Sequence, residues 1–186
     1  MSDTQKKAAI RAFVALELPA RVRAALGKTI DGLTPAVPSI RWADPAQTHL
    51  TLRFLGWTTR ERLSVLETRL AALAGATPAL SARVGGLGLF PPSGRARVLW
   101  VGVALPPEGT KLQADCEAAA VASGFPPERR DFKPHLTLGR WRDPAPRPRL
   151  RDADLGSAVL DRLTLFRSEL RHTGSEYTPL ASFTLG

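Results

Sequence analysis

The sequence predicts a mixed fold of strands and helices that contains an internal duplication. The run THLTL at residues 48–52 returns as PHLTL at residues 134–138, and two of the three histidines in the chain lie in these runs. Each run follows a strand-like and then a helix-like segment, so the same order of elements occurs twice. With 186 residues, 44% of them hydrophobic, the chain is long enough to form one large domain or two closely packed lobes.

The first half predicts two strands that alternate with two helices. An apolar strand is expected at residues 10–18, a helix at 20–33, a short extended piece at 40–42, the first motif strand up to residue 56 and a second helix up to residue 75. Apolar residues recur in both helices at spacings of three and four, which is typical of one buried face. These residues are Val22, Leu26, Ile30 and Leu33 in the first helix and Leu63, Leu66, Leu70 and Leu73 in the second.

The second half repeats this order and adds strands at its end. Residues 79–92 predict a bulged strand that runs into a loop, because their second part is rich in glycine and proline. Residues 98–103 predict an apolar strand and residues 111–122 a helix, and the second motif strand follows. Residues 142–149 are basic and rich in proline, which predicts a loop. The last two expected strands are residues 159–170 and 177–185.

The repeated motif places a histidine and a threonine on the same face of a strand. Side chains alternate between the two faces, so His49 and Thr51 point one way while the leucines point to the core. His135 and Thr137 have the same relation in the second run. One such run is typical of an ordinary half-buried strand, but two copies favour a catalytic arrangement.

Two histidines that face one phosphate can supply acid and base catalysis without a metal ion. An unperturbed imidazole has a pKa of about 6.5, so one ring can take a proton from water while the other protonates a departing ribose oxygen. Thr51 and Thr137 would donate hydroxyl hydrogen bonds to the phosphate oxygens. Nearby arginines would strengthen this phosphate site.

Arg53 and Arg140 are the arginines nearest to the motifs in the sequence. Arg53 follows His49 by four residues, so a regular strand places it on the face of the histidine. Arg140 follows His135 by five residues and needs a bulge, for example at Gly139, to reach that face. Strand alternation therefore favours Arg53 as a phosphate ligand, and the alternative for either arginine is a solvated charge at a strand end.

The composition favours a polyanionic partner. Lysine and arginine number 26 against 17 acidic residues, and the net charge of +9 favours RNA or DNA as that partner. Cys116 is the only cysteine, so the chain forms no internal disulfide and no thiolate metal cluster. No segment has the pattern of a secretory leader or a membrane helix, so we expect a cytoplasmic protein that does not bind membranes. Nothing in the sequence demands a dimer, so we expect a monomer.

The paired motifs resemble those of the 2H phosphoesterase superfamily, and within it the RNA 2′,3′-cyclic phosphodiesterases, also called 2′-5′ RNA ligases. The similarity covers nearly the whole chain and is highly specific. It is carried by residues 13–19, 41–42, 49–56, 98–103 and 132–140 and by Ser168, Gly174 and Tyr177. It implies an α+β fold in which residues 1–186 form one bilobal domain. Two pseudo-symmetric lobes of mainly antiparallel sheet, with outer helices, would each lend one motif to a central cleft.

The resemblance also implies an activity and its residues. An RNA terminal 2′,3′-cyclic phosphate, or a cyclic nucleotide, would be opened to a 2′-phosphomonoester without a metal or other cofactor, and some members also join RNA ends reversibly through a 2′-5′ bond. His49, Thr51, His135 and Thr137 match the catalytic residues of the family. His49 would be the proton donor to O3′, and His135 would be the proton acceptor that activates water.

Several alternatives stay open from the sequence. Phe90 and Trp57 lie near the motif strands and are candidates to stack on a base, although Phe90 also fits a place in the core. His172 lies beside a turn and is expected to be a surface or structural residue. An alternative to an enzyme is a module that binds RNA ends without turnover. A hydrolase with His49 and His135 as metal ligands is disfavoured, because neither motif contains an acidic residue.

Overall fold

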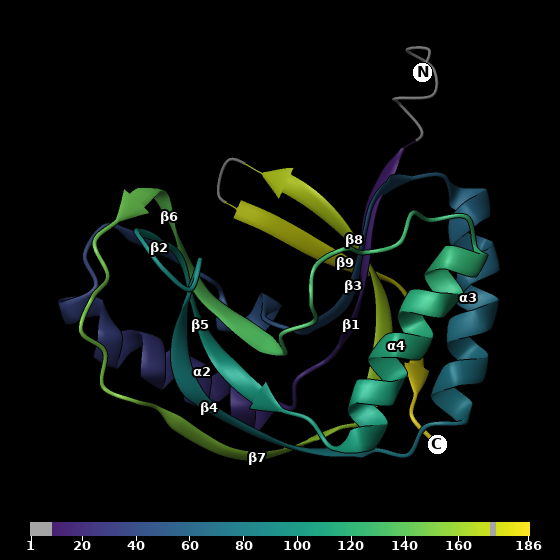
Figure 1. Cartoon of the computed structure of the whole chain (residues 1–186). Coiled ribbons are helices and arrows are strands. Elements are labelled where there is room, and N and C mark those ends of the chain that lie inside the picture. The colour runs from purple at the N-terminus through teal and green to yellow at the C-terminus, as the bar shows by residue number, and fades with distance from the viewer. Residues whose placement is uncertain (1–8, 172–173) are drawn as a thin grey trace.

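The computed structural model describes residues 9–171 and 174–186, which form two antiparallel sheets packed with three α-helices (Figure 1). The strands are β1 (Ile10–Leu16), β2 (Ile40–Trp42), β3 (Leu50–Thr58), β4 (Leu80–Phe90), β5 (Ala96–Ala104), β6 (His135–Ala145), β7 (Asp154–Leu160), β8 (Arg162–Arg171) and β9 (Gly174–Thr184). The helices are α2 (Ala20–Leu33), α3 (Arg60–Gly75) and α4 (Pro107–Ala122), with short 3₁₀ helices at Thr34–Ala36 and Pro45–Gln47.

The two motif strands lie in different sheets. The first sheet has the strand order β3-β1-β8-β9, and the second has the order β2-β6-β5-β4-β7. β3 pairs with β1, the strand that precedes helix α2, and β6 pairs with β5, the strand that precedes helix α4. The α+β fold of two mainly antiparallel sheets is therefore confirmed, and the repeated order of strand, helix and motif strand is also present.

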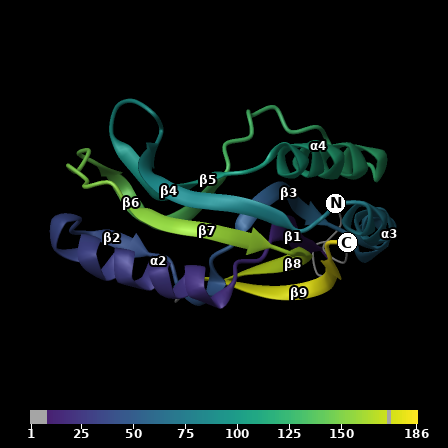
Figure 2. The same cartoon turned by 90° about the horizontal axis from the view of Figure 1, so that it is seen from below.

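The two sheets exchange elements instead of following the two halves of the chain. The C-terminal hairpin β8–β9 completes the first sheet, whereas β2, from the first half, pairs with β6 in the second. Helix α4 follows β5 of the second sheet but contacts β3 of the first, beside α3. Helix α2 contacts β7 on the other side of the molecule (Figures 1 and 2). Because of this exchange, one continuous apolar core joins both sheets.

The hydrophobic stripes of the helices account for most of this packing. All four predicted residues of α2 are buried, namely Val22, Leu26, Ile30 and Leu33. In α3, Leu63, Leu66 and Leu70 are buried as expected, but Ala74 replaces Leu73 at the end of the stripe. Each α-helix buries one face against a sheet, which leaves the opposite faces of the sheets free to form the cleft.

Several boundaries differ from the prediction. Helix α4 begins at Pro107 instead of residue 111, because proline is well tolerated at the first helical position. Residues 142–145 extend β6 and are not part of a loop. The single strand expected at 159–170 is the end of β7 followed by β8. His172 lies outside the described residues. Among the described helices, none combines the length and apolar character needed to cross a membrane.

Both motif strands contain a β-bulge directly after the motif. The register of β3 on β1 shifts between Val14 and Ala15, and that of β6 on β5 shifts between Leu99 and Trp100. At each shift, two consecutive residues of the motif strand are buried, so the alternation of side chains restarts one residue later. The residue five positions after each histidine therefore faces the cleft. These residues are Phe54 in β3 and Arg140 in β6.

Candidate active site

The two His-x-Thr motifs line one cavity between the sheets. The cavity has a volume of about 600 Å³. His49 and Thr51 contribute to its first wall, and His135 and Thr137 contribute to the second. Two His-x-Thr pairs from strands more than 80 residues apart in the sequence thus face the same space, as the duplication predicts. No group of three or more His, Cys, Asp or Glu side chains within residues 9–171 and 174–186 is placed to hold a metal ion.

The His49 ring is held by aromatic side chains and one backbone hydrogen bond. It stacks on Phe13 at 4.5 Å between ring centroids and meets the edge of Tyr177 at 4.8 Å. Its Nδ1 lies 2.9 Å from the carbonyl oxygen of Gln47, whose side-chain oxygen accepts a hydrogen bond from the Tyr177 amide. Burial lowers the pKa of His49 to about 4, although the hydrogen bond to Gln47 opposes this effect.

The His135 ring has a similar setting in the second wall. Its Nδ1 lies 2.6 Å from the carbonyl oxygen of Lys133, and Phe90 meets the ring at 5.0 Å. Trp100 lies beside both rings, 5.1 Å from Phe90 and 6.0 Å from His135 between centroids, and a side chain at Gly88 would overlap the Trp100 ring. Burial lowers the pKa of His135, the hydrogen bond to Lys133 raises it, and the nearby charge of Arg140 lowers it further.

These contacts fix which nitrogen of each ring is available for chemistry. A carbonyl oxygen only accepts hydrogen bonds, so Nδ1 of both His49 and His135 carries the hydrogen. Each neutral ring therefore has its lone pair on Nε2. One ring can take a proton at Nε2, and the other, once protonated, can give one from the same atom.

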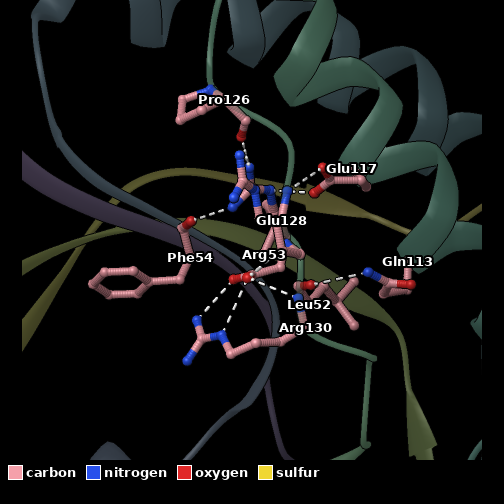
Figure 3. A network of polar contacts seen from close by, with 9 residues as sticks. Leu52, Arg53, Phe54, Gln113, Glu117, Pro126, Glu128 and Arg130 are labelled. Atoms are coloured by element: carbon pink, nitrogen blue, oxygen red, sulfur yellow. Dashed lines mark hydrogen bonds and ion pairs between the residues drawn. The ribbon is translucent and has the colours of Figure 1, made fainter.

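The expectation that Arg53 faces the cleft is wrong. The bulge turns Arg53 to the opposite side of β3, where only 6% of its surface is exposed. Figure 3 shows its guanidinium among groups from α4 and the following loop. It forms an ion pair with Glu117, donates a hydrogen bond to the carbonyl of Pro126, and donates another to the carbonyl of Phe54 at 2.6 Å. Arg53 therefore connects β3 to the segment that leads to His135.

A second set of contacts continues this network into the loop before β6. The Glu117 carboxylate accepts a hydrogen bond from the Glu128 amide at 2.8 Å. Arg130 binds the Glu128 carboxylate through Nε at 3.1 Å and through its terminal nitrogen at 2.7 Å, and this pair lowers the pKa of Glu128 to about 2 (Figure 3). The loop that positions Lys133 and His135 is thus tied to helix α4.

Arg140 and the aromatic residues of the cleft also differ from the simple strand pattern. Arg140 lines the cavity because β6 contains the bulge that this position requires. Neither of the two candidate stacking residues lines the cavity: Phe90 packs against the His135 ring, and Trp57 is 66% exposed. Phe54 lines the cavity instead, with the guanidinium of Arg11 4.5 Å above its ring. Sequence reasoning missed Phe54 because it assumed regular alternation after Thr51.

Comparison with known proteins agrees with this geometry. A family model described as the 2′-5′ RNA ligase superfamily matches residues 22–172, which include both motifs. The chain belongs to the 2′-5′ RNA ligase superfamily. Two relatives named RNA 2′,3′-cyclic phosphodiesterase are similar over most of their length. The protein from Methanothermobacter thermautotrophicus is 33% identical over 95% of this chain and 99% of its own. The protein from Thermus thermophilus is 36% identical over 95% of this chain and 90% of its own.

Solved structures related to this superfamily member have the same fold. The crystal structure of TT0787 of Thermus thermophilus superposes with a TM-score of 0.84 at 33% sequence identity, over 95% of this chain and 98% of that one. The crystal structure of LigT from E. coli complexed with 3′-AMP has a TM-score of 0.78 and 30% identity, with the same coverage of both chains. In the superfamily member described here, two bulged strands of different sheets bring the motifs to one cleft.

Proposed function

We propose that this protein hydrolyses RNA terminal 2′,3′-cyclic phosphates to 2′-phosphomonoesters. The observation that carries this proposal is the pair of His-x-Thr motifs on opposite walls of one cavity, each with Nε2 of its histidine free. The relatives named RNA 2′,3′-cyclic phosphodiesterase support the choice of substrate. The positive charge of the chain suits a polyanionic substrate.

The reaction proceeds by in-line displacement at phosphorus. Nε2 of His135 takes a proton from water, whose oxygen forms the new bond to phosphorus. The P–O3′ bond breaks on the opposite side, and Nε2 of the protonated His49 gives its proton to O3′. The phosphate is left on O2′, and the two rings have exchanged protonation states. If the 5′-hydroxyl of another RNA replaces water, the same steps form a 2′-5′ bond, and their reversal cleaves it.

Thr51, Thr137 and Arg140 stabilise the phosphate during this displacement. The two hydroxyls lie two residues from the histidines on the same strand faces, and they donate hydrogen bonds to the non-bridging oxygens. Arg140 adds positive charge at the second wall. The acid and base steps use only side chains of the chain itself, so no metal ion is required.

The identity of the product tests this proposal. The purified protein is incubated with a short RNA that ends in a 2′,3′-cyclic phosphate, with a chelator present, and the product is compared with 2′- and 3′-phosphate standards by chromatography. A 2′-phosphate is expected. A 3′-phosphate would mean that O2′, and not O3′, is the leaving group. If activity is lost with the chelator and returns with zinc or manganese, a metal-dependent hydrolase is favoured. If RNA is bound but no product forms, a binding module is favoured.

The lowered pKa values of both histidines predict an acid-shifted pH profile. Turnover needs His49 protonated and His135 neutral, so kcat/KM should be highest between the two pKa values of the free protein. Burial lowers the pKa of His49 to about 4, which is the lower limit, and it brings the pKa of His135, the upper limit, below the usual 6.5. We expect kcat/KM to fall on both sides of this range, roughly tenfold per pH unit at the limits.

The kcat profile should lie at higher pH than the kcat/KM profile. The bound phosphate is negative and favours the imidazolium form of His49, which raises its pKa in the complex. Both profiles are measured with a cyclic phosphate substrate from roughly pH 3 to pH 9, so that the falls on both sides of the maximum are covered. An alkaline fall of kcat/KM that begins only above about pH 7 would contradict the assignment, since neither histidine of the free protein titrates there.

A further inference from the structure

Two arginines lie directly opposite one another at the edge of the second sheet. Arg41 of β2 pairs in register with Arg140 of β6, and both side chains are exposed and line the cavity. Directly opposite residues of an antiparallel pair share one face, with Cβ atoms roughly 4.5–5.5 Å apart. Like charges at this separation destabilise a sheet. The arrangement therefore creates a site whose charge is balanced only when an anion binds.

Neither arginine has an ion pair or a side-chain hydrogen bond among the described residues, whereas each of the other two arginines of the cleft has a polar partner. Arg171 pairs with Glu169 and Glu176. Arg11 covers Phe54 and donates a hydrogen bond to Ser168 at 2.6 Å. Asp44 also lines the cavity, but its carboxylate accepts a hydrogen bond from the Ala46 amide at 2.8 Å. Among the described residues that line the cavity, Arg41 and Arg140 are therefore the arginines whose guanidinium groups make no hydrogen bond or ion pair.

The backbone holds the arginine pair together. A Cβ atom at Gly139 would lie 2.7 Å from Cδ1 of Ile40 and 3.0 Å from the carbonyl oxygen of Arg41. The missing side chain at Gly139 therefore lets β2 lie close against β6. The Ala43 amide continues this pairing with a hydrogen bond of 2.8 Å to the carbonyl of Leu138. The pair is built into the sheet and does not depend on two mobile loops.

Arg41 lies one strand farther from His135 than Arg140 does, because β2 is the edge strand beside β6. The charge of Arg140 lowers the pKa of His135, so Arg140 lies near the reacting phosphate, and a neighbouring strand is roughly 4.7–4.9 Å away. We propose that Arg41 binds the phosphodiester that joins the terminal nucleotide to the one before it, beside Arg140. This inference rests on the proposed function and names its substrate class: an oligoribonucleotide is the preferred substrate over a nucleoside 2′,3′-cyclic phosphate.

The equivalent point of the first wall differs from the arginine pair. Phe54 occupies the position that Arg140 occupies in the second wall, because both follow the same bulge. The guanidinium of Arg11 covers the Phe54 ring and donates a hydrogen bond to Ser168, so the cation of this wall already has two partners. Arg41 and Arg140 have no such partners among the described residues, which favours the second wall as the place for the second phosphate.

Three substrates of different charge test the subsite. They are adenosine 2′,3′-cyclic phosphate, adenylyl-(3′,5′)-adenosine 2′,3′-cyclic phosphate, and the same dinucleotide with an uncharged methylphosphonate linkage. The wild-type protein should have a kcat/KM about tenfold or more higher for the charged dinucleotide than for either other substrate, mainly through KM. Arg41→Gln should remove most of this advantage. Arg69→Gln, which removes the same charge from the exposed face of α3, should keep it.

The outcomes separate this inference from the proposed function. Equal kcat/KM for the charged and uncharged dinucleotides in the wild-type protein would overturn the subsite alone. An equal fall for all three substrates in Arg41→Gln would also overturn it, since Arg41 would then act on the reacting phosphate or the fold.

If no substrate turns over, the proposed function fails, and equilibrium binding of the two 2′-phosphorylated dinucleotides still decides the subsite. Tighter binding of the charged dinucleotide, lost in Arg41→Gln, supports it, and equal binding overturns it.

Discussion

Replacement of His49 or His135 by alanine is expected to lower kcat by more than about 100-fold. Each substitution removes a proton donor or acceptor from the cleft, and such groups contribute roughly 10²–10⁴-fold to turnover. The two residues act in one displacement, so the double variant should be nearly as active as the less active single variant. Steady-state hydrolysis of an RNA terminal cyclic phosphate measures the effect.

The threonine of each motif provides a matched control for the histidine variants. Thr51→Ala and Thr137→Ala each remove a hydroxyl that, in the proposed mechanism, donates one hydrogen bond to the phosphate, but they leave both rings in place, so their losses should be smaller than those of the histidine variants. Thermal unfolding of each variant separates lost chemistry from lost structure. Ordinary turnover by either single histidine variant would disprove the acid and base mechanism.

Replacement of Arg53 by alanine is expected to destabilise the protein by about 3 kcal/mol and to lower activity. The substitution leaves the Glu117 carboxylate without its ion-pair partner and the Pro126 carbonyl without its donor. It also removes the link between β3, which follows His49, and the loop that carries Lys133. Urea unfolding gives the change in free energy, and kcat gives the effect on the site.

A double variant without either charge tests whether Arg53 acts as the partner of Glu117 or as a ligand of the substrate phosphate. Arg53→Met combined with Glu117→Met removes both charges, so the part of the loss that comes from the unpaired Glu117 carboxylate should return, while the Pro126 carbonyl and the Glu128 amide stay without their partners. If Arg53 bound the substrate directly, the double variant would recover stability but show a KM raised as far as in Arg53→Ala. We expect its KM to return toward the wild-type value together with its stability.

The two motifs could be predicted from the sequence because they repeat, whereas the contacts that complete the site could not. The repeat placed His49, Thr51, His135 and Thr137, and simple alternation within each short run is sufficient to orient them. Alternation failed one residue beyond the motif. A β-bulge depends on how a strand pairs with its neighbour, and the sequence of β3 alone does not predict that its register on β1 shifts.

The surroundings of the histidines depend on residues that are far away in the sequence. Phe13, Phe166 and Tyr177 reach His49 from three different strands, and Phe90 reaches His135 from a fourth. Their local sequences predict strands but give no information about which ring they will contact. The pairing of β2 with β6 is also invisible locally, so Arg41 could be recognised only as part of a family resemblance and not as the partner of Arg140.

The C-terminal hairpin has a consequence for how the protein folds as it is made. β8 pairs with β1, although about 150 residues separate them in the chain, and β9 supplies Tyr177 against His49. Until residues 162–184 have been made, the first sheet consists of β1 and β3 alone, with α4 packed on β3. The wall that carries the first histidine is therefore completed only after these residues have been synthesised, and the long-range pairing makes that step slow.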